Sequence, residues 1–428
     1  FNFATANLTS IDVIAGGADA DTISLSDDNT VVDADFTNVT SVETLTAAAN
    51  FDSTITLGAL ASAAGITTVT LTGEANADTD TLTVGAGFSS ALTVNLDADD
   101  AAANTVNAAA YTGALTIAAA DSEIDSQAHT LTGGTGTSDT LSITAGGNAI
   151  AAADLANVTA IETFDITATT AAATITLSDN NAAAGETLTV SSAQTTGVLT
   201  LDGSAEADGN LIITAAGTGA HIITLGSGND SYTSTSSGID TVTATAGTNT
   251  IVTGAGNDAI TMGTGADNIT AGAGDDTITV ATANFTSADT IGGGADDDTI
   301  TLSDDNTVVD TDFTNVTSVE TLTAAADIDS TITLGALASA AGITTVTLTG
   351  EAAADTDTLT VGAGFASALT VNLDDDANTA NTVNAAAYTG ALTIAADDDE
   401  IDDQAHTLTG GTGTSDTLSI TAGGNAIA

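Results

Sequence analysis

The sequence contains no lysine, arginine, proline, cysteine or tryptophan, and aromatic residues fill only 3% of its 428 positions. Because 57 acidic residues face no basic side chains, the formal net charge is −57. Nucleic-acid binding and docking on anionic lipid both need a basic surface, so the charge excludes them. The lack of cysteine excludes disulfide scaffolds, thiolate metal sites and cysteine nucleophiles. No apolar run reaches about 18 residues, so we expect neither a membrane-spanning helix nor direct membrane insertion.

The residues that are present are mostly small or β-branched. Hydrophobic residues make up 42% of the chain and the mean hydropathy is +0.26. Disordered acidic chains are much poorer in apolar residues. Too few large side chains are available to fill a compact core, whereas a thin core between stacked short strands needs few. The composition therefore favours a repetitive solenoid over several globular domains.

A long internal duplication dominates the organisation of the chain. Residues 22–151 recur as residues 299–428 at an offset of 277, and only 13 of the 130 aligned pairs differ. We divide the chain into a first, partial copy (1–151), a related β sub-module (152–225), a run of nine-residue repeats (226–281) and a second copy (282–428). The chain starts with Phe1 rather than an initiator Met, so we expect an excerpt of a longer parent with more copies. Near-identical copies suit a mechanical or lattice protein, in which one contact is made many times.

Short segments in which Thr alternates with apolar residues predict β-strands. Examples are 54–57, 69–71, 82–84 and 92–94, with related segments at 174–177, 188–190, 199–201 and 211–213. Their spacing of roughly 10–15 residues is compatible with a β-sandwich or a solenoid. The Ala-rich stretches 58–64 and 151–153 predict single helical turns.

One stretch carries a recognisable chemical pattern. Three nine-residue repeats follow one another without a break, beginning at Gly254, Gly263 and Gly272, and a related repeat begins at Gly226. Each has Gly at its first and third positions, Asp at its fifth and an apolar or aromatic residue at its seventh. Looser repeats place Asp240 and Asn249 in the same phase. The pattern is typical of calcium-binding β-solenoids.

The spacing has a physical basis. Glycines permit a tight turn, and Asp supplies a hard oxygen ligand for Ca²⁺ together with carbonyls of the turn. Because two nonapeptides make one coil, each turn stacks on the turn two repeats later. A cation between turns is then shared by Asp258 with Asp276, by Asp240 with Asp258, and by Asn249 with Asp267. Without the ion the stacked carboxylates repel, so metal binding becomes part of folding.

This stretch resembles the repeats-in-toxin (RTX) family, and the composition of the chain resembles its S-layer and giant-adhesin branch. The resemblance implies bound Ca²⁺, an extracellular bacterial location and folding after secretion. The turn glycines are Gly226, Gly228, Gly254, Gly256, Gly263, Gly265, Gly272 and Gly274. The candidate metal ligands are Asp21, Asp230, Asp240, Asn249, Asp258, Asp267, Asp276 and Asp298. The repeats that contain Asp21 and Asp298 depart from the pattern because they lack the second glycine.

Other polar residues give weaker indications. The acidic clusters 296–298, 374–376 and 397–400 suit solvated loops that bind cations weakly. His129, His221 and His406 occur singly, and no nucleophile elbow or His/Asp partnership is present. We therefore expect no enzymatic activity.

We expect an all-β, elongated, right-handed parallel β-solenoid with calcium-binding turns. The function favoured is a calcium-stabilised building block of a bacterial S-layer, sheath or surface filament, which associates with itself at the cell surface. The alternative is the extender region of a giant type I-secreted adhesin, which spaces a distal binding domain. A remote third candidate is an ice- or surface-binding solenoid, because Thr-x-Thr rows can form a flat face.

Overall fold

A computed structural model provides the coordinates of the chain. It describes residues 1–4, 7–27, 29–47, 51–72, 79–96, 103–167, 170–193, 195–305, 307–325, 328–349, 356–373, 380–398, 401 and 405–421.

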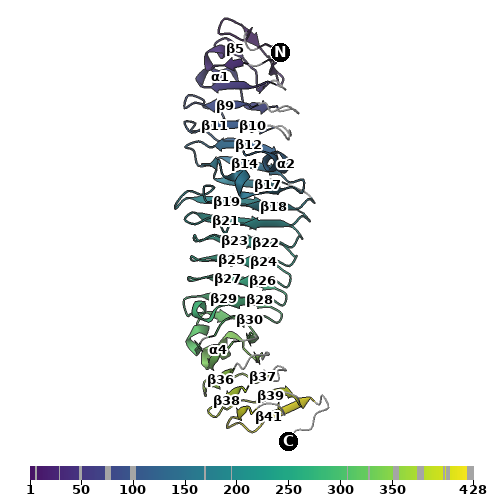
Figure 1. Cartoon of the computed structure of the whole chain (residues 1–428), viewed down its shortest axis with the longest axis vertical. Coiled ribbons are helices and arrows are strands. Elements are labelled where there is room, and N and C mark those ends of the chain that lie inside the picture. The colour runs from purple at the N-terminus through teal and green to yellow at the C-terminus, as the bar shows by residue number, and fades with distance from the viewer. Residues whose placement is uncertain are drawn as a thin grey trace. The chain divides into compact units, whose positions relative to one another are not determined.

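The chain forms two compact units, Phe1–Asp230 and Ser231–Ala428. Each unit is a parallel β-solenoid in which short strands stack as successive rungs (Figure 1). Strands that follow one another in a sheet lie about one coil apart in the sequence; for example, Thr22 pairs with Thr44 and Thr277 with Thr299. The predicted all-β solenoid is therefore confirmed, and the β-sandwich is excluded.

Unit Phe1–Asp230 contains three stacks of strands and one additional pair. The first stack is β1 (Asn2–Phe3), β3 (Thr22–Leu25), β6 (Thr44–Thr46), β8 (Thr68–Leu71), β10 (Leu92–Leu96), β12 (Leu115–Ala120), β14 (Thr140–Thr144), β17 (Thr163–Thr167), β19 (Thr187–Ser192) and β21 (Asn210–Ala215). The second is β4 (Asn29–Val31), β7 (Ser53–Leu57), β9 (Thr81–Val84), β11 (Thr105–Asn107), β13 (Thr130–Thr132) and β16 (Val158–Thr159). The third is β15 (Ala149–Ile150), β18 (Ala173–Thr176), β20 (Leu199–Asp202) and β22 (Ile222–Thr224), and β2 (Ile14–Ala15) pairs with β5 (Val39–Thr40).

Unit Ser231–Ala428 likewise contains three stacks. The first is β23 (Ser231–Ser234), β25 (Thr250–Val252), β27 (Asn268–Ala273), β29 (Thr290–Ala295) and β32 (Val316–Thr317). The second is β24 (Thr241–Thr243), β26 (Ala259–Thr261), β28 (Thr277–Val280), β30 (Thr299–Leu302), β33 (Thr321–Ala324), β35 (Thr345–Leu348), β37 (Leu369–Leu373), β39 (Leu392–Asp397) and β41 (Thr417–Thr421). The third is β31 (Thr307–Val308), β34 (Thr331–Leu334), β36 (Thr358–Val361), β38 (Thr382–Asn384) and β40 (Thr407–Thr409).

The alternating sequence explains why these strands form a thin core. In β3, β6 and β8 the apolar residues Ile23, Leu45 and Val69 are paired in register and fully buried. The Thr residues between them point outward and are only partly covered. Burying one such aliphatic side chain stabilises the fold by about 1.5–3 kcal/mol. The core is therefore a series of columns in which aliphatic side chains of successive strands stack on one another, as the period-2 pattern predicts.

The helical segments are single turns at the corners. They are α1 (Ala59–Ala64), α2 (Asp121–Ser126), α3 (Ala152–Leu155) and α4 (Ala336–Ala341), with 3-10 turns η2 (Asp33–Phe36), η3 (Thr282–Asn284) and η4 (Asp310–Phe313). The helical turns expected at 58–64 and 151–153 correspond to α1 and α3. Among the described residues, no helix is long and apolar enough to cross a membrane.

The two copies of the duplicated segment adopt the same local structure. Helix α1 ends at Gly65 and α4 at Gly342, both in the left-handed conformation. The rings of Phe88 and Tyr111 pack edge to face with centroids 5.8 Å apart, and those of Phe365 and Tyr388 repeat this distance.

The tight turn predicted for the nine-residue repeats has a steric basis at Gly274. A Cβ there would lie 2.3 Å from the carbonyl oxygen of Gly256, one coil earlier.

The corner glycine gives a test with a matched control. Gly274 and Gly17 share a φ of +122°, but a Cβ on Gly17 meets nothing within 4 Å. Both Gly→Ala changes incur the cost of a left-handed Ala, of order 1–3 kcal/mol. We expect G274A to lose clearly more stability than G17A in urea unfolding, because only G274A also forces two coils apart. Equal losses in the two variants would contradict the close packing of coils at Gly274.

Candidate metal centre

The nine-residue repeats place acidic side chains in one column, which we call the acidic column: Asp240, Asp258, Asp276, Asp298 and Glu320. Each side chain after Asp240 accepts a hydrogen bond from the backbone N–H of the column residue one coil earlier. The Asp240 amide donates to Asp258 Oδ1 at 2.7 Å, and the Asp258 amide donates to Asp276 Oδ1 at 2.7 Å. The Asp276 amide donates to Asp298 Oδ1 at 2.9 Å, and the Asp298 amide donates to Glu320 Oε2 at 3.0 Å. Five carboxyl groups therefore follow one another on successive coils.

A second column runs along the alternate repeats. The Asn249 amide donates to Asp267 Oδ1 at 3.0 Å, and the Asp267 amide donates to Asp289 Oδ1 at 3.0 Å. Asp289 Oδ2 accepts from the backbone N–H of Thr286 at 2.8 Å. The structure thus stacks all three pairs expected from the sequence: Asp258 with Asp276, Asp240 with Asp258, and Asn249 with Asp267.

Several carboxylate oxygens of the acidic column are buried without a hydrogen-bond partner among the described residues. Asp276 is 1% exposed and Asp298 is fully buried. The Oδ2 atom of each is inaccessible and has no hydrogen-bond partner among the described residues. A buried, ionised oxygen in this state costs several kcal/mol unless a cation or a proton compensates it.

The same burial shifts the acid–base equilibria of these groups. Burial raises the pKa of Asp276 to about 7, against the lowering effect of the hydrogen bond from the Asp258 amide, and the nearby Asp258, Asp298 and Asp275 carboxylates raise it further. Burial also raises the pKa of Asp298 to about 6, with an added contribution from Glu320. The column therefore favours a bound positive charge, either a proton or a metal ion.

The hydrogen bond from a backbone N–H at a corner of one coil to a side chain of the next coil, which we call the corner hydrogen bond, is not specific to the nine-residue repeats. In the first copy, the Ser53 amide donates to Asp80 Oδ1 at 2.8 Å and the Asp80 amide donates to Asn104 Oδ1 at 2.9 Å. The Asn104 amide donates to His129 Nδ1 at 3.0 Å, while His129 Nε2 lies 3.1 Å from the carbonyl oxygen of Glu123. Burial lowers the pKa of His129, in keeping with a neutral ring that accepts at Nδ1. That column holds one carboxyl group among four residues, whereas the acidic column holds five in succession. Shorter runs of two carboxyl groups also occur, as in Asp267 with Asp289 and Asp139 with Glu162.

The remaining predicted ligands lie in less acidic surroundings. Asp230 is buried and accepts the Leu211 amide at 2.7 Å. Asp21 is partly exposed, and its amide donates to Glu43 Oε2 at 2.8 Å.

Asp296 occupies the position where the other repeats have their second glycine, and its φ is +83°. Asp tolerates this left-handed conformation better than most residues, which explains how the repeat departs from the pattern without losing the turn.

The eight predicted turn glycines lie where coils approach most closely. At Gly226, Gly228, Gly254, Gly256, Gly263, Gly265, Gly272 and Gly274, an added Cβ would come within 1.8–2.7 Å of a backbone carbonyl oxygen of the preceding coil. Of the acidic clusters noted in the sequence, residues 374–376 and 399–400 lie outside the described residues.

Sequence reasoning missed several members of the corner columns. Glu43, Glu162, Asp289 and Glu320 were not among the expected ligands, although each accepts or neighbours a corner amide. A signal was present: each precedes Thr and then a buried apolar or aromatic residue, as Asp240 and Asp276 of the repeats do. His129 and its copy His406 obey the same rule, because each precedes Thr and Leu, whereas His221 precedes Ile222.

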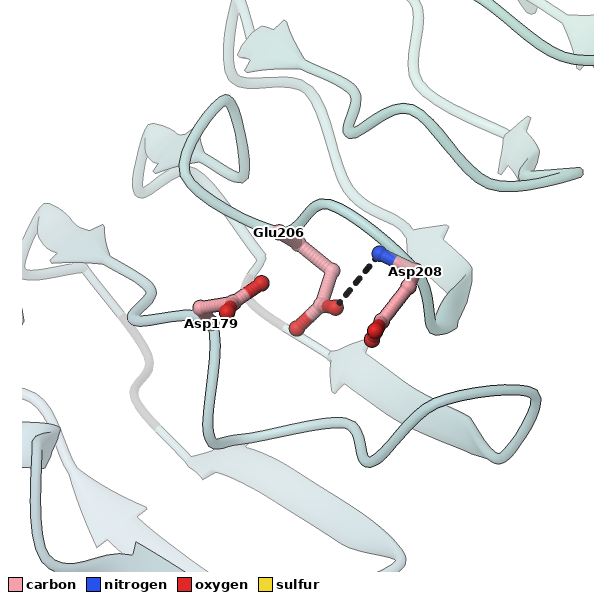
Figure 2. Close-up of side chains that lie close together, drawn as sticks. All are labelled: Asp179, Glu206 and Asp208. Carbon is pink, nitrogen blue, oxygen red and sulfur yellow. Dashed lines mark hydrogen bonds between the residues drawn. The ribbon is translucent and has the colours of Figure 1, made fainter.

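A second acidic group lies outside the repeats (Figure 2). Asp179, Glu206 and Asp208 come from the turns after β18 and β20, and their carboxylate oxygens lie within 4.8 Å of one another. It is the one group of three such side chains that the described residues bring so close. Glu206 is fully buried, but its oxygens accept the amides of Ala182 at 3.2 Å and Gly209 at 3.0 Å. Backbone donors therefore already satisfy its most buried member.

The raised pKa values make the stability of the metal-free chain depend on pH. The ordinary value is 3.8, so the folded chain binds more protons than the unfolded chain between about pH 4 and pH 7. The stabilisation is fully present below about pH 4 and is lost as the pH rises through 6 and 7. In excess chelator we expect roughly 4 kcal/mol less stability at pH 8 than at pH 5 from these two groups.

Urea unfolding at several pH values checks this expectation. D276N removes one titrating group, so its stability should fall less between pH 5 and pH 8 than that of the unmodified chain. D125N, at an exposed position on α2, should keep the full pH dependence. Identical pH profiles for D276N and the unmodified chain would contradict the assignment.

Comparison with known proteins adds no further identification. The chain matches no protein-family model, no curated protein and no solved structure. A parallel β-solenoid alone does not identify an RTX protein. The functional argument therefore depends on the residues of this chain.

Proposed function

We propose that the chain is an extracellular structural repeat protein, a calcium-stabilised building block of a bacterial S-layer, sheath or surface filament. The observation that carries the proposal is the acidic column, in which four buried carboxyl groups and the partly exposed Glu320 follow one another on five successive coils. The chain has no Lys or Arg to neutralise them. A structure of this kind requires cations from outside the protein.

Calcium fits the donors that are present. It prefers carboxylate and carbonyl oxygens in a flexible geometry. Asp258, Asp276 and Asp298 would hold it in the acidic column, and Asp267 with Asn249 in the second column. The Oδ2 atoms of Asp276 and Asp298 accept no hydrogen bond from any described residue, so they are available as oxygen ligands for a metal ion. When bound, the ion would neutralise the stacked carboxylates and tie successive coils together.

A surface-layer role accounts for the other peculiarities of the chain. Divalent cations would screen its charge and allow neighbouring copies to approach. The two nearly identical copies present the same surface twice, as a lattice or filament requires. A chain without Lys and Arg has no trypsin cleavage site, which protects an exposed coat.

The extender of a giant adhesin is the second candidate. The observation that favours it is that the duplicated segments fold alike and bury their own cores, as spacer repeats do. An extender is monomeric in calcium, whereas a lattice protein associates. Sedimentation velocity in calcium and in EGTA distinguishes the two functions.

Calcium removal tests the proposal directly. In millimolar Ca²⁺ we expect the chain to unfold at a higher urea concentration than in EGTA; at 100 times the Kd, one site adds about 2.7 kcal/mol. D276N should lose much of this calcium-dependent gain because it removes a charged ligand. The exposed-site variant D125N serves as the control and should keep the gain. Equal stability with and without calcium at pH 8 would overturn the proposal.

A further inference from the structure

We infer that the outward face of the sheet β24–β41, with its counterpart in the first copy, is the surface through which copies of the chain contact one another side by side. The inference rests on the self-association contained in the proposed function and specifies where it occurs. The occupant is a second copy of this chain.

The face is built from threonine rows in register. One row runs through Thr277, Thr299, Thr321, Thr345, Thr370 and Thr393, each paired with the next on the neighbouring strand. The positions two residues further along β28, β30, β33 and β35 are also Thr. These side chains point outward, because the apolar residues between them are buried.

Charge is absent from this face although it is dense elsewhere. No residue in strands β24 to β37 of this sheet is charged, and the first carboxylate met along it is Asp397, at the end of β39. The turns carry the acidic residues, including the exposed Asp275, Asp297 and Asp305. The solenoid therefore separates neutral faces from acidic edges.

This separation decides where two copies can meet. Without Lys or Arg, any contact between edges sets carboxylates against carboxylates, and their repulsion opposes association, more strongly at a protein surface than in free water. Contact between neutral faces avoids that cost. Threonine hydroxyls both donate and accept hydrogen bonds, so the face is complementary to itself, as a two-fold contact requires.

The duplication supplies the same face twice. In the first copy, Thr22, Thr44, Thr68, Thr93 and Thr116 form the equivalent row on β3 to β12. At about 4.8 Å per strand, one row of six spans only about 24 Å, which is small for a stable interface. Each contact is therefore weak by itself, and each chain offers two such rows, one in each unit, through which it can contact further copies.

Placing charge on the face tests the inference in the full-length chain. The face variant carries four Asp substitutions in the threonine rows: T44D, T68D, T321D and T345D. The control variant adds the same four charges at exposed turn positions: S26D, A86D, S303D and A363D. In calcium we expect the face variant to associate about tenfold or more weakly than the control by sedimentation velocity, with both keeping a β-type circular dichroism spectrum.

A charge-swap rescue guards against misfolding. A variant with Lys at the four face positions, mixed with the face variant, should form mixed assemblies more readily than either forms alone. Equal weakening of the face and control variants, or no rescue, would overturn the inference while leaving calcium stabilisation intact. If the unmodified chain stays monomeric in calcium, the proposed self-association fails as well. If that monomer shows thermal hysteresis that the face variant lacks, the face binds ice rather than a second copy, and the inference is wrong.

Discussion

The fold depends on one recurring hydrogen bond, from a corner backbone N–H to a side chain supplied by the next coil. A solenoid bends sharply at each corner, and the amide at the bend has no strand partner. A buried amide without an acceptor costs about 1–3 kcal/mol, so nearly every coil needs a polar side chain at this point. Aspartate, glutamate, asparagine and histidine all fulfil the requirement in this chain. The aliphatic columns supply the bulk of the stability, and the corners determine where each coil can turn.

The choice of corner side chain then separates neutral columns from charged ones. Asn104 and His129 satisfy their amides without placing a charge inside the protein. Asp258, Asp276 and Asp298 accept from the equivalent corner amides of their own column. They create a line of negative charge in a chain that contains no Lys or Arg. A carboxylate accepts such a hydrogen bond more strongly than an amide oxygen does, but its buried charge then needs a compensating proton or cation. Under the proposed function, that cation is Ca²⁺.

The sequence predicts the coil but only part of the column. Alternation of Thr with Ile, Leu or Val predicts the strands, because a two-residue period has one structural meaning when one face is buried. The nine-residue spacing likewise predicts that Asp258 stacks on Asp276. Glu320 and Glu43 were missed because they lie in coils of 22–25 residues, in which the partner position depends on loop lengths that no periodicity reveals. Asp179 meets Glu206 and Asp208 for the same reason: their separation of 27–29 residues has no counterpart in the repeat.

The hydrogen bonds of the acidic column have a direction, since each corner amide from Asp240 to Asp298 takes its acceptor from the coil that follows it. A fragment that begins at a coil boundary leaves a carboxylate exposed at its first corner, and water or salt solvates that group readily. A fragment that ends at a coil boundary leaves an N–H group exposed at its last corner, together with the apolar top of the core. A cut at the amino-terminal side exposes the other apolar end of the core, and it also removes acceptors such as Asp310, which binds the Gly335 amide of the following coil. A shortened version of such a solenoid therefore needs a cap over both ends and a polar side chain for each amide that loses its acceptor.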